Sequence, residues 1–412
     1  MIGVDEALRY VLEAAGAGEP VPAEAVPLAA ATGRVLRETV SADADMPPFT
    51  RSAMDGYAVR AADTAGAPVA LEVVEEIPAG AAPRRRLAPG QASRIMTGAA
   101  LPEGADAVQM VERTEPDQAG KVRILLPVSP GEHVRRQGED LKCGAVLVES
   151  GVVLGPAHIG LLASCGRGVV SVSRRPRVAI IPTGDELVTI DRQPGPTQIR
   201  ESNGHVLESL ARLAGGEPDR RDITPDDAAL LRRTIGAALA ACDVLLLSGG
   251  VSMGDYDLVG AALLQLGCRP AFDRVAIQPG KPLWFGTWAR PGGGDVLVFG
   301  LPGNPVSTLV DFLVFARPAL RRLAGASSWL DATVAARLAE PLSRRGGRRA
   351  YLPASLADEQ IGPTVRLLPS MGSADMVALA RADALAIIPE EAERLEAGVR
   401  VRALPLAGLT RA

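Results

Sequence analysis

The sequence is poor in the side chains that form most metal centres and nucleophilic catalytic sites. Its 412 residues include four cysteines and three histidines. The cysteines are far apart and show no metal-ligand spacing, and the histidines share no pairing motif. These absences argue against a zinc site and against a Ser-His-Asp triad. Three of the cysteines follow small or apolar residues and are expected to be buried thiols: Cys165, Cys242 and Cys268.

Other residue types and patterns are also scarce. Aromatic residues make up 3% of the chain, which leaves few platforms on which single-stranded nucleic acid could stack. The net charge of −4 and the pI of about 5.7 also argue against a nucleic-acid partner. No apolar run reaches the roughly 18 residues of a membrane span, and Met1–Ala15 is an amphipathic pattern with early acidic residues rather than a basic signal. We therefore expect a cytoplasmic protein.

Turn-forming residues, in contrast, are abundant, with 44 glycines and 33 prolines. The length predicts about two to four domains. Two consecutive prolines exclude a helix from the loop Ala42–Asp55. From Tyr57 to about Val148, short alternating runs are separated by glycine or proline, which is typical of a small barrel or sandwich. Pro156 is expected to open a helix over 155–166.

From Arg177 to about Leu323 the pattern alternates between strand and helix, which predicts a doubly wound α/β domain. After Ala326 short strand patterns return and predict a small C-terminal β domain. The expected α/β strands are 177–181, 219–223, 243–248, 273–277, 283–288 and 295–300, and the expected helices are 203–214, 226–241, 256–266 and 305–323. The expected C-terminal strands are 332–338, 365–368, 384–388 and 399–403.

Three turns of the α/β region carry most of the functional information. Ile181–Leu187, Leu247–Asp255 and Gly300–Val306 each follow a strand pattern and precede a helical one. The carboxyl ends of parallel strands lie at one edge of a sheet, where open α/β sheets bind ligands. Glycine there allows close approach of the backbone, and a helix N-terminus favours an anion. We therefore expect these turns to bind a phosphorylated small molecule.

Acidic residues in and beside these turns would repel a phosphate unless a divalent cation lay between them. The pattern therefore predicts Mg²⁺ in the same site. The acidic residues are Asp185, Glu186, Asp255 and Asp257.

Each segment also has a plain structural interpretation. Ser248-Gly249-Gly250 could be only a tight turn, and Asn304 only a helix cap before Pro305. Lys281, in Gln278–Pro282, could be a solvated residue of a hairpin turn or a cation directed at a phosphate.

Similar alternatives hold outside the three turns. Asp-Gly turns are common, so Ser52–Tyr57 could be structural, as could Arg94–Gly98 and Gly138–Leu141. Arg344–Arg349 could be a solvated loop or an anion clamp.

Taken together, these segments resemble the molybdopterin molybdenumtransferase family, which includes MoeA and the E-domain of gephyrin. The resemblance covers roughly the whole chain, in the family's order and spacing. The matching strings are MPPFTRSAMDGYAVR from Met46, RIMTGAALPEGADAVQMVE from Arg94, GEDLKCG from Gly138, PTGDEL from Pro182, DVLLLSGGVSMGDYD from Asp243, QPGKPLWFG from Gln278 and GLPGNPVS from Gly300.

The resemblance implies four domains: an extended N-terminal domain (1–46 and 141–176), a β-rich insert (47–140), a molybdopterin-binding α/β domain (177–325) and a C-terminal β-barrel-like domain (326–412). It also implies a homodimer whose active cleft lies between the α/β domain of one subunit and the insert of the other. The implied reaction is Mg²⁺-dependent insertion of molybdate into adenylylated molybdopterin with release of AMP. The adenylyltransferase of the same pathway is a further candidate partner.

The resemblance also implies site residues by position. Catalytic roles fall to Asp55, Asp140, Glu186, Asp257 and Lys281, and Mg²⁺ ligation to Glu186, Asp226 and Asp257. Substrate binding falls to Thr97, Thr183, Gly184, Asp226, Ser248, Gly249, Gly250, Ser252, Pro302, Gly303, Asn304, Pro305, Arg349 and Ser373.

Two departures from the family pattern affect phosphate and anion contacts. Gln278 stands where many relatives have a second lysine, so phosphate binding is expected to depend more on Lys281 and on arginines. Leu352-Pro353 stands where an arginine is frequent, which weakens any anion contact predicted there.

Two other functions are compatible with such a crevice. One is a binding or scaffold module that presents the pterin or docks a partner protein. The other is a pyrophosphatase or adenylyltransferase that acts on a different nucleotide.

Overall fold

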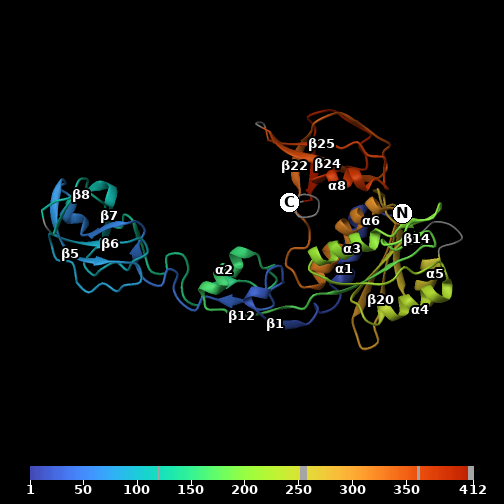
Figure 1. The fold of residues 1–412 in the computed structure, drawn as a ribbon, viewed down its shortest axis with the longest axis horizontal. Helices are drawn as coiled ribbons and strands as arrows, with labels where there is room; N and C mark the ends of the chain where they lie inside the picture. The colour runs from blue at the N-terminus through green and yellow to red at the C-terminus, as the bar shows by residue number, and fades with distance from the viewer. Residues whose placement is uncertain (119, 251–257, 360–361, 407–412) are drawn as a thin grey trace. The chain divides into compact units, whose positions relative to one another are not determined.

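A six-stranded sheet forms the centre of the α/β region (Figure 1). Its first four strands are parallel, the fifth pairs antiparallel with the fourth, and the sixth pairs antiparallel with the fifth. This arrangement confirms the predicted α/β class. The strands in spatial order are β16 (Glu217–Arg220), β13 (Arg177–Pro182), β17 (Val244–Ser248), β21 (Asp295–Leu301), β20 (Pro282–Ala289) and β18 (Arg269–Arg274).

Helices cover both faces of this sheet, as in a doubly wound fold. Side chains alternate along the strands, so Val178 and Ile180 pack on one face while Ala179 and Ile181 pack on the other. The first face is covered by α1 (Val4–Ala15), α3 (Asn203–Leu213), α6 (Pro305–Asp311), the π-helical segment η4 (Phe312–Ala316) and α7 (Arg317–Leu323), and the second by α4 (Ala228–Leu239) and α5 (Leu258–Gln265).

The first helix belongs to this α/β core. Val4, Ala7 and Val11 are buried in the same hydrophobic cluster as the central strands. The expected single helix over 305–323 is continuous, but its middle turn is π-helical. A π-helical turn widens the helix locally and is often found at functional sites.

The C-terminal region forms a small closed barrel. Strand β24 pairs with both β25 and β26, and the ring is completed by pairings of β25 with β22, β22 with β28, and β28 with β26. The barrel strands are β22 (Val334–Leu338), β24 (Arg349–Glu359), β25 (Gly362–Leu367), β26 (Ala384–Ile388) and β28 (Arg400–Pro405), with the short helix α8 (Met376–Arg381) beside them.

The longest strand of this barrel, β24, was absent from the sequence prediction. Pro353 lies in its interior, and proline normally indicates a strand edge or a break. One short strand outside the barrel, β19 (Ile277–Gln278), pairs in parallel with the start of β24. The segment Gln278–Pro282 therefore links the α/β sheet to the barrel and is not a simple hairpin turn.

The structure describes residues 1–118, 120–250, 258–359 and 362–406. They form a larger unit (Met1–Glu38, Ser150–Pro156, Val169–Ala412) and a smaller unit (Thr39–Glu149, Ala157–Gly168). The larger unit contains the α/β sheet, the barrel and a two-stranded sheet of β1 (Ala23–Pro27) and β12 (Val169–Ser173).

The smaller unit is built on a separate six-stranded sheet. Its interior holds alternate residues of each strand, such as Leu71, Val122 and Ile124, which explains the short alternating runs of the sequence. The strands in spatial order are β7 (Ala107–Met110), β4 (Gly56–Val59), β6 (Gln91–Ile95), β5 (Val69–Ile77), β9 (Lys121–Ile124) and β8 (Thr114–Pro116).

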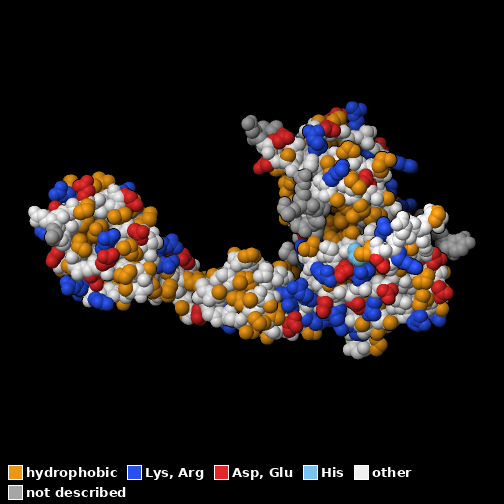
Figure 2. Space-filling model, in the orientation of Figure 1, with side chains coloured by type: hydrophobic (Ala, Val, Ile, Leu, Met, Phe, Trp, Pro, Cys, Tyr) orange, Lys and Arg blue, Asp and Glu red, His pale blue; other side chains and the backbone are white. Residues whose placement is uncertain are grey.

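Basic and acidic side chains are interspersed over the visible face of the molecule (Figure 2). Among the described helices, none is both long and apolar enough to cross a membrane. The three cysteines that were expected to be buried, Cys165, Cys242 and Cys268, are buried free thiols.

Candidate functional site

The three glycine-containing turns lie at one edge of the α/β sheet. Strands β13, β17 and β21 are parallel neighbours, and their last residues Pro182, Ser248 and Leu301 stand in register. The sequence prediction that these turns share an edge is therefore confirmed. We call this edge the turn crevice, and it is built from residues 182–186, 248–250 and 301–304.

The turn crevice requires glycine at two positions because neighbouring atoms leave no room for a Cβ there. Gly249 has a φ of +93°, and a Cβ atom there would lie 2.4 Å from the carbonyl oxygen of Thr183. At Gly250 (φ +67°) a Cβ would lie 2.5 Å from Val259 Cγ2. The Thr183 N–H donates to Ser248 O (2.9 Å), and the Gly249 N–H donates to Leu301 O (3.2 Å). These contacts hold the turns together.

One asparagine joins two of these turns. Asn203 is the first residue of α3, and its Nδ2 donates to Ser248 Oγ and to Gly303 O, both at 2.8 Å. The sequence analysis did not select Asn203. Its only signal was a polar residue at a helix start, where asparagine is common for reasons of capping alone.

Acidic side chains gather at one end of the turn crevice. The Asp226 N–H donates to Asp185 Oδ1 at 3.0 Å. Partial burial, followed by repulsion from Asp185 and Glu186, raises the pKa of Asp226. Carboxylate oxygens are the kind of ligand that Mg²⁺ prefers. The described residues contain no group of three or more His, Cys, Asp or Glu arranged to hold a metal ion.

A cavity of about 530 Å³ lies between the α/β domain and the barrel. Lys281 and Arg348 line it, and within the described part of the chain neither side chain has a hydrogen-bond or ion-pair partner. Among the described residues that line it there is no aspartate or glutamate. Two uncompensated cations in a partly enclosed space favour an anionic ligand. We call this space the lysine cavity.

The lysine cavity adjoins the turn crevice through the loop Pro302–Asn304. Pro302 and Asn304 line the cavity, while Gly303 O accepts the bond from Asn203 on the crevice side. Ser373, from the barrel region, lines the cavity and accepts a bond from Asn304 Nδ2 at 2.9 Å. The lysine cavity and the turn crevice therefore share one wall, the loop Pro302–Asn304.

Two details of this loop differ from the sequence interpretation. The Asn304 side chain does not cap α6, because it bonds to Ser373 instead. The backbone N–H groups of Gly249 and Val306 donate to Leu301 O and Ser373 O and so are not free for an anion, which the sequence placed at these turns and helix starts. Pro305 is the first residue of α6, as predicted.

An arginine contacts Gln278, the residue at which the sequence departs from the expected family pattern. Arg344 Nη2 donates to Gln278 Oε1 at 3.2 Å and to the Arg348 carbonyl at 2.6 Å. Burial, followed by repulsion from Arg348, lowers the pKa of Arg344. The expectation that phosphate binding depends on Lys281 and on arginines stays a prediction.

A buried carboxyl group lies behind the lysine-bearing loop. Asp311 is 0% exposed, and its carboxyl oxygens have no hydrogen-bond partner among the described residues. A Cβ on Gly280 would lie 2.2 Å from Asp311 Oδ1, so the loop passes directly over it. Burial raises the pKa of Asp311 well above its usual range.

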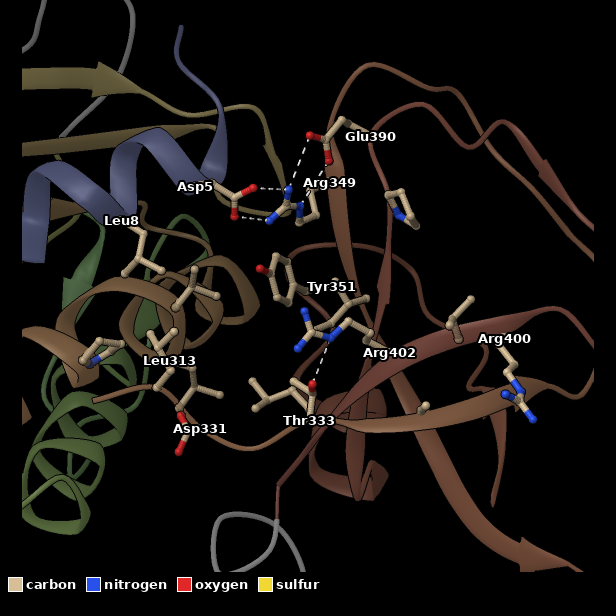
Figure 3. Close-up of a pocket in the computed structure, with 18 of the residues that line it drawn as sticks. Asp5, Leu8, Leu313, Asp331, Thr333, Arg349, Tyr351, Glu390, Arg400 and Arg402 are labelled. Atoms are coloured by element: carbon tan, nitrogen blue, oxygen red, sulfur yellow. Dashed lines mark hydrogen bonds and ion pairs between the residues drawn. The ribbon is translucent and has the colours of Figure 1, made fainter. Parts of the chain in front are cut away.

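Arg349, predicted to bind substrate beside Ser373, lies in a different place (Figure 3). Its guanidinium forms a bidentate ion pair with Asp5 (2.6 and 2.8 Å) and also contacts Glu390 (3.1 Å). This group lines a second cavity of about 590 Å³ bounded by α1, η4, α7 and the barrel. Adjacent residues of a strand point to opposite faces, so Arg348, which the prediction did not single out, takes the position in the lysine cavity.

The smaller unit holds the three remaining predicted residues. Asp55 Oδ1 accepts bonds from the Thr97 N–H (2.6 Å) and Oγ1 (2.7 Å), and these bonds lower the pKa of Asp55. Asp140 is ion-paired with Arg135. Gly56 is required because a Cβ there would lie 1.9 Å from Gln109 O. The Asp-Gly pair is therefore the start of strand β4 rather than an ordinary surface turn.

Ser252, Asp255 and Asp257 lie outside the described residues. The predicted roles of these three residues remain predictions.

Together the fold and the site define a multidomain protein with a doubly wound α/β domain, a separate β-rich unit and a small C-terminal barrel. Three family models cover the chain: MoeA N-terminal region (domain I and II) over 2–166, Probable molybdopterin binding domain over 179–322, and MoeA C-terminal region (domain IV) over 335–406. The chain belongs to the MoeA family.

Similar proteins of known name support this assignment. A molybdopterin molybdenumtransferase from a Nostoc species is 41% identical over 389 residues, covering 93% of this chain and 88% of the relative. Molybdopterin molybdenumtransferase 2 of Mycobacterium tuberculosis is 39% identical and covers 98% of this chain and 99% of the relative. The crystal structure of the molybdopterin biosynthesis moeA protein from Pyrococcus horikoshii has a TM-score of 0.80 at 31% identity, covering 98% of this chain and all of that one.

Proposed function

We propose that this protein is a molybdopterin molybdenumtransferase that inserts molybdate into adenylylated molybdopterin and releases AMP. The observation that carries the proposal is that the turn crevice and the lysine cavity share one wall, the loop Pro302–Asn304. The cavity presents Lys281 and Arg348 without acidic residues, while the crevice presents carboxylates. A phosphoanhydride substrate requires both, since its phosphates need cations and its divalent counter-ion needs oxygen ligands.

In this proposal the lysine cavity holds the anionic end of the substrate. Lys281 is a compact point charge, whereas Arg348 can bind two oxygens of one oxyanion through its planar fork. Arg344 and Gln278 hold one wall of the cavity through their mutual hydrogen bond. Cleavage of a phosphoanhydride depends on positioning and charge neutralisation rather than on a nucleophilic side chain. A site without cysteine or histidine is consistent with this chemistry.

Mg²⁺ is part of the proposal, with Glu186 and Asp226 as its ligands in the described structure and Asp257 as a further candidate. When bound, it would neutralise charge on the phosphates as the bond to AMP breaks. The raised pKa of Asp226 supports this assignment, since a cation would relieve the repulsion from its neighbours.

We also propose that two copies of the chain complete the site. Asp55 is oriented by Thr97 through two hydrogen bonds, and Asp140 by Arg135, yet neither pair has an assigned role within the smaller unit. Preorganised carboxylates on an exposed surface are suited to meet a substrate held elsewhere. In a homodimer they would act on the substrate bound by the other copy.

The decisive experiment is an anaerobic incubation of the full chain with adenylylated molybdopterin, measuring AMP and active cofactor. Release of AMP should require both molybdate and Mg²⁺. Lys281→Gln should lower turnover by about tenfold or more, because one charge-assisted contact is lost. Lys121→Gln, an exposed lysine of the smaller unit, should leave turnover unchanged.

Other outcomes would favour the alternative functions. Tight pterin binding without metal insertion would indicate a binding module. Hydrolysis of simple nucleotides in the absence of pterin would indicate a pyrophosphatase. Either result, or equal turnover of the two lysine variants, would contradict the proposal.

A further inference from the structure

A third cavity, which shares no lining residue with the two cavities described above, has five arginines among its described lining residues. It has a volume of about 300 Å³ and lies in the larger unit, where β12 ends beside the C-terminal ends of α3 and α7. No aspartate or glutamate lines it. Its five charged lining residues are Arg34, Arg174, Arg175, Arg212 and Arg321.

Arg175 is the least compensated of these arginines. Within the described part of the chain its side chain is half-buried and has no hydrogen-bond or ion-pair partner. Arg34 is 8% exposed, and both of its hydrogen bonds, to Glu24 and to Ser173 O, are made by Nη2. The remaining donors of this nearly buried guanidinium are left for another partner.

The acidic residues behind the cavity are shared among additional arginines. Asp243 binds Arg174 at 2.6 Å but also lies within ion-pair distance of Arg177 and Arg290. Three of the four acids that pair with the lining arginines thus serve more than one cation, while Glu24 pairs with Arg34 alone. The other shared acids are Glu208, which binds Arg212 and Arg220, and Asp331, which binds Arg321 and Arg317.

A plainer explanation is that these arginines compensate the negative ends of α3 and α7. A helix end carries about half an elementary charge, so two ends account for about one arginine. These ends are moreover already capped. The N–H groups of Ala214, Gly215 and Gly216 donate to the last carbonyls of α3, and Ser173 Oγ donates to Ala324 O at 2.5 Å after α7. Neutralisation of the two helix ends therefore does not explain Arg175, whose side chain has no partner in the described part of the chain.

We propose that this cavity, which we call the arginine cavity, binds a phosphate-bearing small molecule, with Arg175 and Arg34 as its principal contacts. Guanidinium groups bind phosphate through paired, charge-assisted hydrogen bonds. The volume equals that of about ten water molecules, which is enough for pyrophosphate or a nucleoside monophosphate. The site does not depend on the proposed enzyme function, because it shares no lining residue with the lysine cavity.

Calorimetric titration of the full chain with pyrophosphate tests this proposal. The titration should be made in a Lys281→Gln background, so that binding in the lysine cavity does not mask the second site. That protein should still bind pyrophosphate, and adding Arg175→Gln should weaken the binding by about tenfold or more. The matched control is Arg233→Gln, which removes the same charge from an exposed position of α4 and should have no effect.

Parallel titrations with different compounds show which part of the ligand the arginine cavity binds. Inorganic phosphate, pyrophosphate and AMP should compete with one another, while adenosine should not. The proposal is overturned if the Lys281→Gln protein binds none of the phosphate compounds, or if the Arg175→Gln and Arg233→Gln additions give equal affinities.

A chemical measurement on the unaltered protein guards against variants that fail to fold. Phenylglyoxal modifies accessible arginines, and pyrophosphate should protect Arg175 but not Arg233 from it. Equal modification of Arg175 with and without pyrophosphate would also overturn the proposal.

Discussion

Arg348 and Arg349 are neighbours in sequence, but their side chains line two different cavities on opposite sides of the start of β24. Arg348 lies in the lysine cavity and has no ion-pair partner among the residues that the structure describes. Arg349 is bound by Asp5 of α1 and by Glu390 of the barrel. One arginine is thus available to a ligand, while the other joins the N-terminal helix to the C-terminal domain.

This difference predicts opposite effects for two matched substitutions. Arg348→Gln should weaken anion binding and turnover while changing stability by no more than about 0.5 kcal/mol. Arg349→Gln should leave anion affinity nearly unchanged and lower the free energy of unfolding by about 1 kcal/mol. The loss is modest because Asp5 and Glu390 are substantially exposed. Tryptophan fluorescence during thermal unfolding reports on the larger unit, since all three tryptophans lie in it.

The stability effect of Arg349→Gln should also depend on pH. Hydrogen bonding to Arg349 lowers the pKa values of Asp5 and Glu390 in the folded protein. Carboxylates whose folded pKa is depressed stabilise the protein above their unfolded values of about 4 and lose that contribution as pH falls through the folded pKa. The difference in melting temperature between wild type and variant should therefore be largest at pH 7 and should disappear at acidic pH. A constant difference would contradict this account.

Gly249 is expected to tolerate no side chain. Gly249→Ala would place a methyl group 2.4 Å from the Thr183 carbonyl and should lower stability by about 1–3 kcal/mol as well as distort the turn crevice. Gly267→Ala is the matched control, because Gly267 also has a positive φ (+80°) but open space around its Cβ position. Thermal unfolding of both variants separates steric collision from backbone strain. Equal losses would show that collision is unimportant.

Removal of one crevice carboxylate should abolish stabilisation by Mg²⁺. In wild type, saturating Mg²⁺ should raise the melting temperature, since a ligand at about 100 times its Kd stabilises the folded state by about 2.7 kcal/mol. Asp226→Asn should melt slightly higher without Mg²⁺, because the repulsion from Asp185 and Glu186 is gone, and should respond little to its addition. Addition of EDTA should reverse the wild-type shift. A full Mg²⁺ response in the variant would remove Asp226 from the ligand set.

The buried carboxyl of Asp311 should make the protein less stable at neutral pH than an amide would. Burial raises its folded pKa, so the native state holds a proton that the unfolded state releases above about pH 4. Stability therefore falls as pH rises above that value. Asp311→Asn should raise the melting temperature at pH 7 by about 2 °C or more, and this advantage should vanish near pH 4. An unchanged or lower melting temperature at pH 7 would indicate that Asp311 has an unseen partner.

The α/β region could be predicted from sequence because its signals are local. Strands such as Val244–Ser248 are uninterrupted apolar runs, and three of them lead into turns rich in glycine. Strand β24 was missed because Pro353 interrupts its pattern. The barrel tolerates this proline because tertiary pairing with β26 on one side and β25 on the other holds the strand.

The chain's own residues, taken alone, determine the α/β class and the common edge of the three turns. These follow from periodicity and from backbone geometry, which act over a few residues. Only the tertiary structure decided that Arg348 rather than Arg349 lines the lysine cavity, that Asn203 joins two turns, and that Arg175 lies unpaired among other arginines. Such relationships depend on strand register and on contacts between distant segments, which no local pattern records.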